Sequence, residues 1–280
     1  MPEPAWPSGR VVAITGGGHG LGAAFARRFA AAGARVAALD LDGPAAENLA
    51  AELEAAGHEA LGLACDVNDA GQCQEALRAA LRRWGRLDVL INNAGITHRS
   101  ALARTSLEVY RRVMEVNYFG ALNCTKAALE ALVASRGLIV VISSVAGFAP
   151  LYGRSGYSAS KHALHGLFES LRGELAPLGV VVCLVCPSFA ATGISHNALD
   201  GDGRPTSHPQ STLGRVASAE EVAEAVFRAA ARRRPLTVLS PVGKLSWWMT
   251  RIAPGLYQKL MARSLRAELQ RPAPGGPFPS

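Results

Sequence analysis

The sequence predicts a single α/β domain in which a doubly wound parallel sheet carries helices on both faces. Apolar strands alternate with helical stretches, and this alternation requires crossover connections between parallel strands. The strand predicted over 137–142 is apolar throughout, as expected for a sheet that helices cover on both sides. Of the 280 residues, 49% are hydrophobic and 18% are charged, which is typical of a globular protein.

The first strand is predicted over 10–15 and runs into a glycine-rich turn. An alanine-rich helical stretch follows, with Leu21, Phe25 and Phe29 at four-residue spacing. A strand, a glycine turn and a helix in this order place backbone N–H groups at a helix N-terminus, which suits a pyrophosphate. Side chains in the turn would hold the phosphates away from the backbone. The turn glycines are Gly16, Gly17, Gly18, Gly20 and Gly22.

The second strand, Arg35–Asp40, ends in an acidic residue 18 residues after Gly22. In a dinucleotide-binding fold, an acid at this place accepts hydrogen bonds from the adenosine ribose and repels a 2′-phosphate. Asp42 is the alternative, and either acid could instead begin the turn at Gly43. We favour Asp40, which predicts a preference for NAD(H) over NADP(H).

Polar clusters close several of the later strands. Because ligands of parallel sheets bind at the carboxyl ends of the strands, these clusters are candidate site residues. They are Asp66-Val67, Asn92-Asn93-Ala94-Gly95 and Ser143-Ser144. Helices are predicted over 45–56, 69–84 and 107–135, and strands over 60–65, 87–91, 137–142, 180–186 and 236–240. Asn117 lies in the middle of the longest helix, where asparagine is unfavourable without a specific role.

A helix predicted to begin near Ser155 places Tyr157 and Lys161 on one face, four residues apart. A phenol beside an ammonium group is suited to acid–base catalysis, because the cation lowers a tyrosine pKa that is ordinarily about 10. Taken alone, the pair is better explained as an ordinary helix start with an exposed tyrosine and lysine. The other motifs therefore decide its interpretation.

In combination, the motifs resemble those of the classical short-chain dehydrogenase/reductase family, whose members have a Rossmann-like fold. They occur in the family's order, and the resemblance extends over about residues 10–240. The matching segments are Thr15–Gly22, Asp66-Val67, Asn92–Gly95, Asn117, Ser143-Ser144, Tyr157 with Lys161, and Pro187 with Thr192.

The resemblance implies a catalytic centre formed by Ser144, Tyr157, Lys161 and Asn117. Tyr157 would exchange a proton with the substrate oxygen, which Ser144 would bind and orient. Lys161 would hold the nicotinamide ribose and lower the Tyr157 pKa, and Asn117 would hold a water that links Lys161 to solvent. The hydride would pass directly between substrate and nicotinamide, so no metal is expected.

The resemblance also implies which residues bind the dinucleotide. They are Gly16, Gly18, His19, Gly20, Leu21, Gly22, Asp40, Asp66, Val67, Asn93, Ala94, Gly95, Tyr157, Lys161, Pro187 and Thr192. The sequence departs from the family pattern at Ser188, where a glycine is usual after Pro187. It also lacks the family's usual C-terminal tetramer segment, so a homodimer or tetramer is expected without assuming those contacts.

The ends of the chain differ in composition from the domain predicted over 10–243. Residues 1–9 contain three prolines and are interpreted as a flexible leader. Residues 244–280 carry a net charge of +5, out of +7 for the whole chain. The rest of the chain has a net charge of only +2, which is too small for a surface that binds nucleic acid. The chain contains neither a signal pattern nor a run of about 20 apolar residues, which predicts a cytoplasmic protein.

The C-terminal extension combines this charge with an apolar stripe. Trp247-Trp248 precede Tyr257, Met261, Leu265 and Leu269, which recur at helical spacing. We interpret the extension as a pocket lid or a dimer contact, and a peripheral membrane contact through 244–271 is the alternative. Both favour a lipophilic substrate. Residues 195–211 occupy the family's substrate-loop position and are expected to be mobile until a ligand binds.

The five cysteines are expected to be buried and reduced. Cys183 and Cys186 lie three apart on a predicted strand and therefore point to opposite faces. The histidines are scattered along the chain, which argues against a metal site. His98, just after the fourth strand, is interpreted as a surface residue.

The sequence therefore predicts an NAD(H)-dependent oxidoreductase that interconverts a secondary alcohol and a ketone. An epimerase or dehydratase with the same fold is one alternative, although the spacing of the glycine turn and the modest length argue against it. A dinucleotide-binding regulator is another, but it would have no use for Ser144, Tyr157 and Lys161 together.

Overall fold

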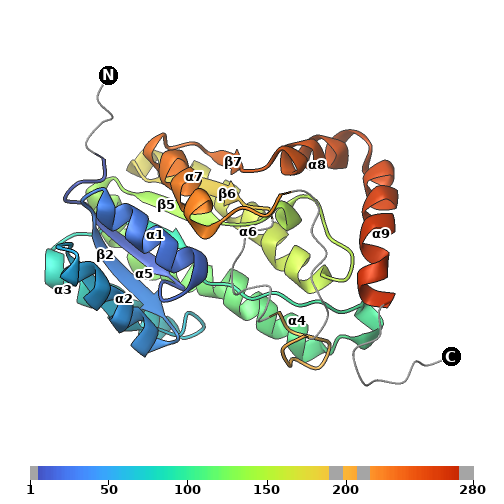
Figure 1. Cartoon of the computed structure of the whole chain (residues 1–280). Coiled ribbons are helices and arrows are strands. Elements are labelled where there is room, and N and C mark those ends of the chain that lie inside the picture. The colour runs from blue at the N-terminus through green and yellow to red at the C-terminus, as the bar shows by residue number, and fades with distance from the viewer. Residues whose placement is uncertain (1–5, 189–197, 207–214, 271–280) are drawn as a thin grey trace.

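The computed structural model of the chain describes residues 6–188, 198–206 and 215–270, the last six of these by backbone alone. These residues contain one seven-stranded parallel sheet with the order β3-β2-β1-β4-β5-β6-β7 (Figure 1). The strands are β1 (Val11–Thr15), β2 (Arg35–Asp40), β3 (Ala60–Ala64), β4 (Val89–Asn92), β5 (Leu138–Ile142), β6 (Val181–Cys186) and β7 (Leu236–Val238). The order reverses between β1 and β4, which confirms the doubly wound fold.

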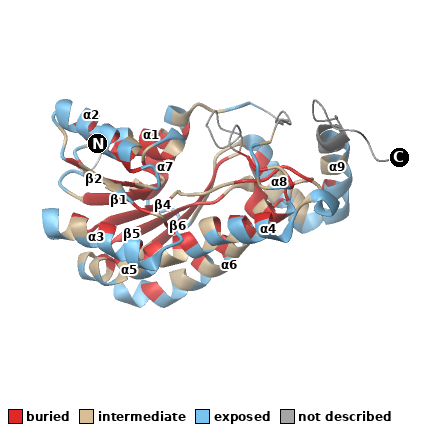
Figure 2. Cartoon of the chain, turned by 90° about the horizontal axis from the view of Figure 1, so that it is seen from below, coloured by how far each residue is buried: buried red, intermediate tan, exposed pale blue. Residues whose placement is uncertain are grey.

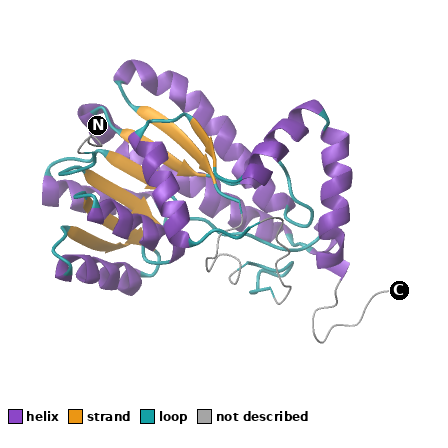
Figure 3. Ribbon diagram, turned by 45° about the horizontal axis from the view of Figure 1, so that its top comes forward, coloured by secondary structure: helices purple, strands orange, loops and turns teal. Residues whose placement is uncertain are grey.

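Helices cover both faces of the sheet (Figure 3). One face carries α1 (Gly20–Ala31), α2 (Gly43–Ala55) and α7 (Ala219–Ala231), and the other carries α3 (Ala70–Trp84), α5 (Gly120–Ser135) and α6 (Ser155–Leu175). Side chains of β1 alternate between the two cores: Val12 and Ile14 join the first, and Val11 and Ala13 the second. Figure 2 shows the strands buried between helices whose outer sides are exposed.

The helix predicted over 107–135 is interrupted. α4 (Leu107–Met114) passes into a π-helical turn, Glu115–Phe119, before α5 begins. The turn places Asn117 in the interior, where its side chain is fully buried. Such π-turns are frequent at functional sites because they reorient one side chain without ending the helix.

Two of the three helices near the C-terminus were not assigned from the sequence, whereas the helical spacing from Tyr257 to Leu269 predicted the third. α7 begins with a capping box, in which the Glu221 N–H donates to Ser218 Oγ at 3.2 Å and the Ser218 N–H donates to Glu221 Oε2 at 3.0 Å. α8 (Pro241–Ile252) follows β7 directly, so the strand predicted over 236–240 ends two residues early. α9 (Pro254–Gln270) completes the described chain. No described helix has the length and apolarity needed to cross a bilayer.

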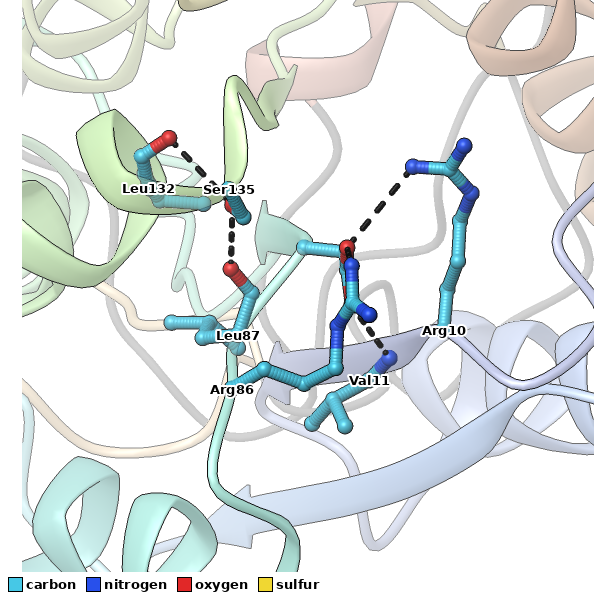
Figure 4. A network of polar contacts seen from close by, with 7 residues as sticks. Arg10, Val11, Arg86, Leu87, Leu132 and Ser135 are labelled. Atoms are coloured by element: carbon cyan, nitrogen blue, oxygen red, sulfur yellow. Dashed lines mark hydrogen bonds and ion pairs between the residues drawn. The ribbon is translucent and has the colours of Figure 1, made fainter.

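Buried Asp88 links the amino ends of β1 and β4. Figure 4 shows Arg10, Val11 and Arg86 gathered in this network of polar contacts. Asp88 Oδ2 accepts hydrogen bonds from the Val11 N–H at 2.9 Å and from Arg86 Nε at 2.8 Å. Arg10 Nη1 lies 3.7 Å from its Oδ1. Nearby, the side chain of Trp6 packs against the rings of Phe29 and Phe227, at centroid distances of 5.8 and 5.5 Å, so the described part of the predicted leader contacts the domain.

All five cysteines are buried and free. Cys183 joins the core under α1 and α7, whereas Cys186 lies with Phe148 and Tyr257 on the other side of β6. The two thiols therefore face opposite sides, as the strand period predicts.

Candidate active site

A cleft follows the carboxyl ends of β1 to β4 and brings most of the predicted dinucleotide residues together. Those that line it are Gly16, His19, Gly20, Leu21, Asp40, Asp66, Val67, Asn93, Ala94 and Gly95. Arg112 and Val116 also line it, from α4 and the π-turn. Sequence reasoning missed these two, because a helix that crosses the cleft from outside the sheet carries no local signal of doing so.

The glycine turn between β1 and α1 is folded so tightly that side chains are excluded. Gly16 has a φ of 62°, in the left-handed region that favours glycine. A Cβ atom on Gly16 would lie 3.0 Å from Ala94 Cα, and one on Gly22 would overlap the carbonyl oxygen of Gly16. With α1 beginning at Gly20, the turn brings a helix N-terminus to the cleft, and this arrangement fits a pyrophosphate.

Asp40 and Asp42 have different partners. Asp40 Oδ2 accepts from the Gly18 N–H at 2.8 Å, and Oδ1 accepts from the Asp42 N–H at 3.0 Å. Asp42 caps α2 through the Ala45 N–H, and its Oδ2 lies 3.0 Å from His19 Nε2, a hydrogen bond that lowers the Asp42 pKa. The carboxylate that lines the cleft is thus Asp40, whereas Asp42 serves the start of a helix.

Thr15 and Asn93 join the ends of β1 and β4 beneath the cleft. Thr15 Oγ1 accepts hydrogen bonds from the Asn93 and Ala94 N–H groups at 2.9 and 3.0 Å. Asn93 Nδ2 donates to the carbonyl oxygens of Thr15 and Gly16 at 2.9 and 3.1 Å. The Asn93 side chain therefore fixes the start of the glycine turn through these two hydrogen bonds.

A second pocket adjoins the cleft at Leu21, Asn93 and Gly95, which line both. Ser144, Tyr157, Lys161 and Pro187 line this second pocket. Ser144 follows β5, and its side chain is close enough to Tyr157 to lower the pKa of the phenol. Lys161 is buried one helical turn after Tyr157; its Nζ donates to the Ile142 carbonyl at 3.0 Å and lies 5.8 Å from the centre of the Tyr157 ring. Thr192 lies outside the described residues.

Burial dominates the ionisation of these groups. It raises the pKa of Tyr157, while the hydrogen bond from Ser144 and the charge of Arg154 act in the opposite direction. It lowers the pKa of Lys161 to about 8. Arg154, three residues before Tyr157, is thus a cation that the Tyr-x-x-x-Lys pattern does not point to.

Asn117 ties the end of β4 to α6. Its Oδ1 accepts from the Ile96 N–H at 2.8 Å, and its Nδ2 donates to the Ile96 carbonyl at 2.9 Å and to Ser160 Oγ at 2.8 Å. Ser160 Oγ in turn donates to the Tyr157 carbonyl at 2.8 Å. A Cβ atom on Gly95 would lie 3.1 Å from Asn117 Oδ1 and 3.6 Å from Lys161 Nζ, so both side chains converge there. Ser160 had no signal in the sequence.

The interpretation of His98 as a surface residue is wrong. The side chain is fully buried, and its Nε2 accepts a hydrogen bond from the Gly156 N–H at 2.9 Å. Burial lowers the His98 pKa to about 4, so the ring is neutral at neutral pH. The first turn of α6 has no side-chain cap from Arg154, and His98 satisfies one of its N–H groups from another segment.

Helices α8 and α9 form one wall of the second pocket. Tyr257 is buried, and its hydroxyl donates to the Pro150 carbonyl at 3.2 Å. The rings of Trp247 and Phe148 meet edge to face at 4.8 Å. Thr97, Arg99, Leu151 and Arg154 also line this pocket. From α8 and α9 the lining side chains are Val242, Leu245, Ser246, Met249, Tyr257, Leu260, Met261 and Ser264. Of the predicted substrate loop, the structure describes only residues 198–206.

A glycine turn after β1, an acid after β2, and a Ser–Tyr–Lys group on β5 and α6 define a dinucleotide-binding type of α/β oxidoreductase. The family model for short chain dehydrogenases matches residues 10–202, and the chain belongs to this family.

Two relatives and two solved structures illustrate the similarity. Dehydrogenase/reductase SDR family member 7B of Bos taurus is 38% identical over 272 residues, which cover 94% of this chain and 84% of that protein. An SDR family protein 7-like protein of Anopheles gambiae is 34% identical, covering 93% and 84%. A short chain dehydrogenase/reductase from Burkholderia phymatum in complex with NAD superposes with a TM-score of 0.74, at 29% identity over 98% of this chain and 99% of that one. A 3-ketoacyl-(acyl-carrier-protein) reductase from Brucella melitensis complexed with NADH gives 0.72, at 26% identity over 83% and 97%.

Proposed function

We propose that the protein is an NAD(H)-dependent oxidoreductase that interconverts a secondary alcohol and a ketone on a lipophilic substrate. The observation that carries this proposal is the grouping of Ser144, Tyr157 and buried Lys161 in one pocket, where the dinucleotide cleft meets the apolar pocket. The solved relatives from Burkholderia phymatum and Brucella melitensis hold NAD and NADH, which supports the choice of cofactor.

The cleft fits a dinucleotide. The tight turn at Gly16 and the start of α1 at Gly20 would hold the pyrophosphate, and Asp40 would bind the adenosine ribose and repel a 2′-phosphate. Asp66 and Val67 would border the adenine. When bound, the nicotinamide supplies or accepts the hydride.

The chain's own residues would move the proton. Because burial raises the Tyr157 pKa, the phenol is protonated at neutral pH and would donate to the oxygen of a ketone during reduction. The Ser144 hydroxyl would donate a second hydrogen bond to the same oxygen as negative charge develops on it. Lys161 would bind the nicotinamide ribose and, as a nearby cation, favour the phenolate that accepts a proton during alcohol oxidation. The homo-oligomer and the cytoplasmic location inferred from the sequence remain predictions.

The proposal is tested by screening secondary alcohols, sterols and long-chain alcohols for NADH formation, and then by the Tyr157→Phe variant. Phenylalanine keeps the ring but removes the transferable proton, so turnover is expected to fall roughly 10²–10⁴-fold. NADH binding, followed by fluorescence, should remain within about twofold. A Phe variant with normal turnover would contradict the mechanism, and NADH binding without turnover on any alcohol or ketone would favour the regulator.

A further inference from the structure

Helices α8 and α9 have two faces with different surroundings. The inner face packs on the domain and lines the pocket through Met249, Tyr257 and Met261. The outer face leaves large apolar side chains in solvent: Trp248 is 62% exposed and Ile252 is 75% exposed. Single exposed apolar residues are ordinary, but a set on two consecutive helices marks an interaction surface. We call this set the outer apolar face; it consists of Val242, Leu245, Trp248, Ile252, Leu256 and Leu260.

The outer apolar face is continuous with the mouth of the pocket. Val242, Leu245 and Leu260 belong to both, since they line the pocket and are 44%, 61% and 45% exposed. The pocket therefore opens within an apolar surface rather than beside it. A ligand that left the pocket here would pass over aliphatic side chains.

Cations accompany these side chains along the segment 241–264. The sequence from Pro241 to Ser264 contains no aspartate or glutamate. Lys244, Arg251, Lys259 and Arg263 are all exposed. On α9, Lys259 and Arg263 lie one turn apart and share a side of the helix with Leu256 and Leu260, as their three- and four-residue spacings require.

The charge decides between the possible occupants of this face. A second copy of the chain related by two-fold symmetry would bring the same cations together, which opposes association. An anionic lipid bilayer suits this face better. Its headgroup phosphates would attract the cations, and its acyl chains would accept the exposed apolar side chains, including Trp248.

We propose that the outer apolar face docks on an anionic lipid bilayer, with the mouth of the pocket turned toward the lipid. Trp248, Ile252 and Leu256 enter the boundary between headgroups and acyl chains, and Lys244, Lys259 and Arg263 lie at the headgroup phosphates. The Arg251 guanidinium instead stacks on the ring of Trp247. The docking does not depend on the reaction, whereas entry of a lipophilic substrate from the bilayer rests on the proposed function.

The first test measures sedimentation of the full-length protein with vesicles. We expect binding to phosphatidylcholine mixed with phosphatidylglycerol, weaker binding to pure phosphatidylcholine, and a loss of binding as salt is added. Lys259→Gln with Arg263→Gln should lower the partition coefficient about fivefold for each cation removed, or roughly 25-fold together. Trp248→Ser with Ile252→Ser should lower it at least about tenfold.

Matched variants on other surfaces serve as controls. Arg78 and Arg83 are exposed cations on α3, so Arg78→Gln with Arg83→Gln removes the same charge far from the outer apolar face in sequence. Leu178 is 48% exposed in the 3-10 turn Ala176–Leu178 that follows α6, and Leu178→Ser removes apolar surface there. Neither control should alter vesicle binding. NADH binding by every variant reports the intact fold independently of the reaction.

A spectroscopic test reports the orientation. Phospholipids brominated near the headgroup should quench the fluorescence of Trp248 on the vesicle, and Trp248→Phe should remove most of that quenching. Vesicle binding that the charge variants do not change would overturn the proposal. So would an absence of binding together with a concentration-dependent dimer that Trp248→Ser with Ile252→Ser dissociates, because the outer apolar face would then be an interface between copies.

Discussion

The Asp40 carboxylate is held by the backbone on both of its oxygens, through the N–H groups of Gly18 and Asp42. It is therefore positioned before a dinucleotide arrives, and under the proposed function its charge would repel a 2′-phosphate. We expect the Asp40→Ala variant to bind NADH about 10–100-fold more weakly, because a charged hydrogen-bond partner is lost. Discrimination against NADPH should fall at the same time.

Asp42→Ala provides the matched control for this experiment. It also removes an aspartate from the same loop, but this one caps α2 and pairs with His19. It should weaken the helix start and leave the choice of cofactor unchanged in fluorescence titrations. A wild-type protein that prefers NADPH would show that the end of β2 has been misread.

Lys161 predicts a pH dependence of stability. Burial lowers its pKa from 10.5 to about 8, so the folded chain releases this proton near pH 8 while the unfolded chain keeps it to about 10.5. Between these values the unfolded state binds more protons, and stability rises with pH. The buried cation therefore costs stability below pH 8, and this cost disappears by pH 10.5. The whole effect corresponds to roughly 3 kcal/mol.

Lys161→Met isolates this effect, because methionine fills similar space without a charge. In urea denaturation, the difference in unfolding free energy between the two proteins should move by roughly 3 kcal/mol in favour of the parent from pH 8 to pH 10.5. A difference that stays constant with pH would mean that Lys161 keeps its ordinary pKa in the folded protein.

Site residues that share a helix face or follow directly after a strand could be predicted from the sequence. Tyr157 and Lys161 are four apart on one helix, and Ser144 closes a strand, so their meeting in one pocket follows from the topology. Ser160 and His98 could not be predicted. Ser160 meets Asn117, and His98 meets the Gly156 N–H, only through the packing of segments that are far apart in the sequence.

At the scale of elements, the alternation of strands and helices predicted the sheet because buried parallel strands are apolar and short. The interruption of the helix over 107–135 could not be predicted in the same way. A π-turn inserts one extra residue into a helical turn, which the hydrophobic pattern does not reveal. The unfavourable position of Asn117 inside a predicted helix was the one feature of the sequence that pointed to it. α7 was missed although Ser218 and Glu221 form a capping box, a signal that sequence reasoning can use.

Asp88 is the polar connection between β1 and β4 at the edge opposite the site. Its side chain is fully buried, so Asp88→Ala leaves the Val11 N–H without its acceptor and Arg86 without its partner. We expect a loss of about 2–4 kcal/mol in urea denaturation. Glu52→Ala breaks the solvent-exposed pair with Arg27 and should change stability by less than about 1 kcal/mol. Equal losses in the two variants would refute this ranking.

At the scale of the whole molecule, the cleft and the pocket have different structural origins. The cleft is built by the carboxyl ends of β1 to β4, and its side chains lie upstream of residue 117. The apolar wall of the pocket comes from α8 and α9, which follow the last strand of the sheet. A change in the C-terminal helices can therefore alter the substrate that fits without disturbing the dinucleotide cleft.

Ending the chain after Ser240 tests this division of roles. The truncated protein keeps all seven strands and every residue that lines the cleft, so NADH affinity should change by less than about threefold. It loses Trp247 and Tyr257, which cover Phe148 and the Pro150 carbonyl. Binding of a hydrophobic fluorescent dye should therefore increase.

KM should rise at least about tenfold for bulky apolar alcohols and little for small ones, because the apolar wall contributes binding energy only to substrates that reach it. A uniform loss of activity on small and bulky alcohols alike would show instead that α8 and α9 support the catalytic residues themselves.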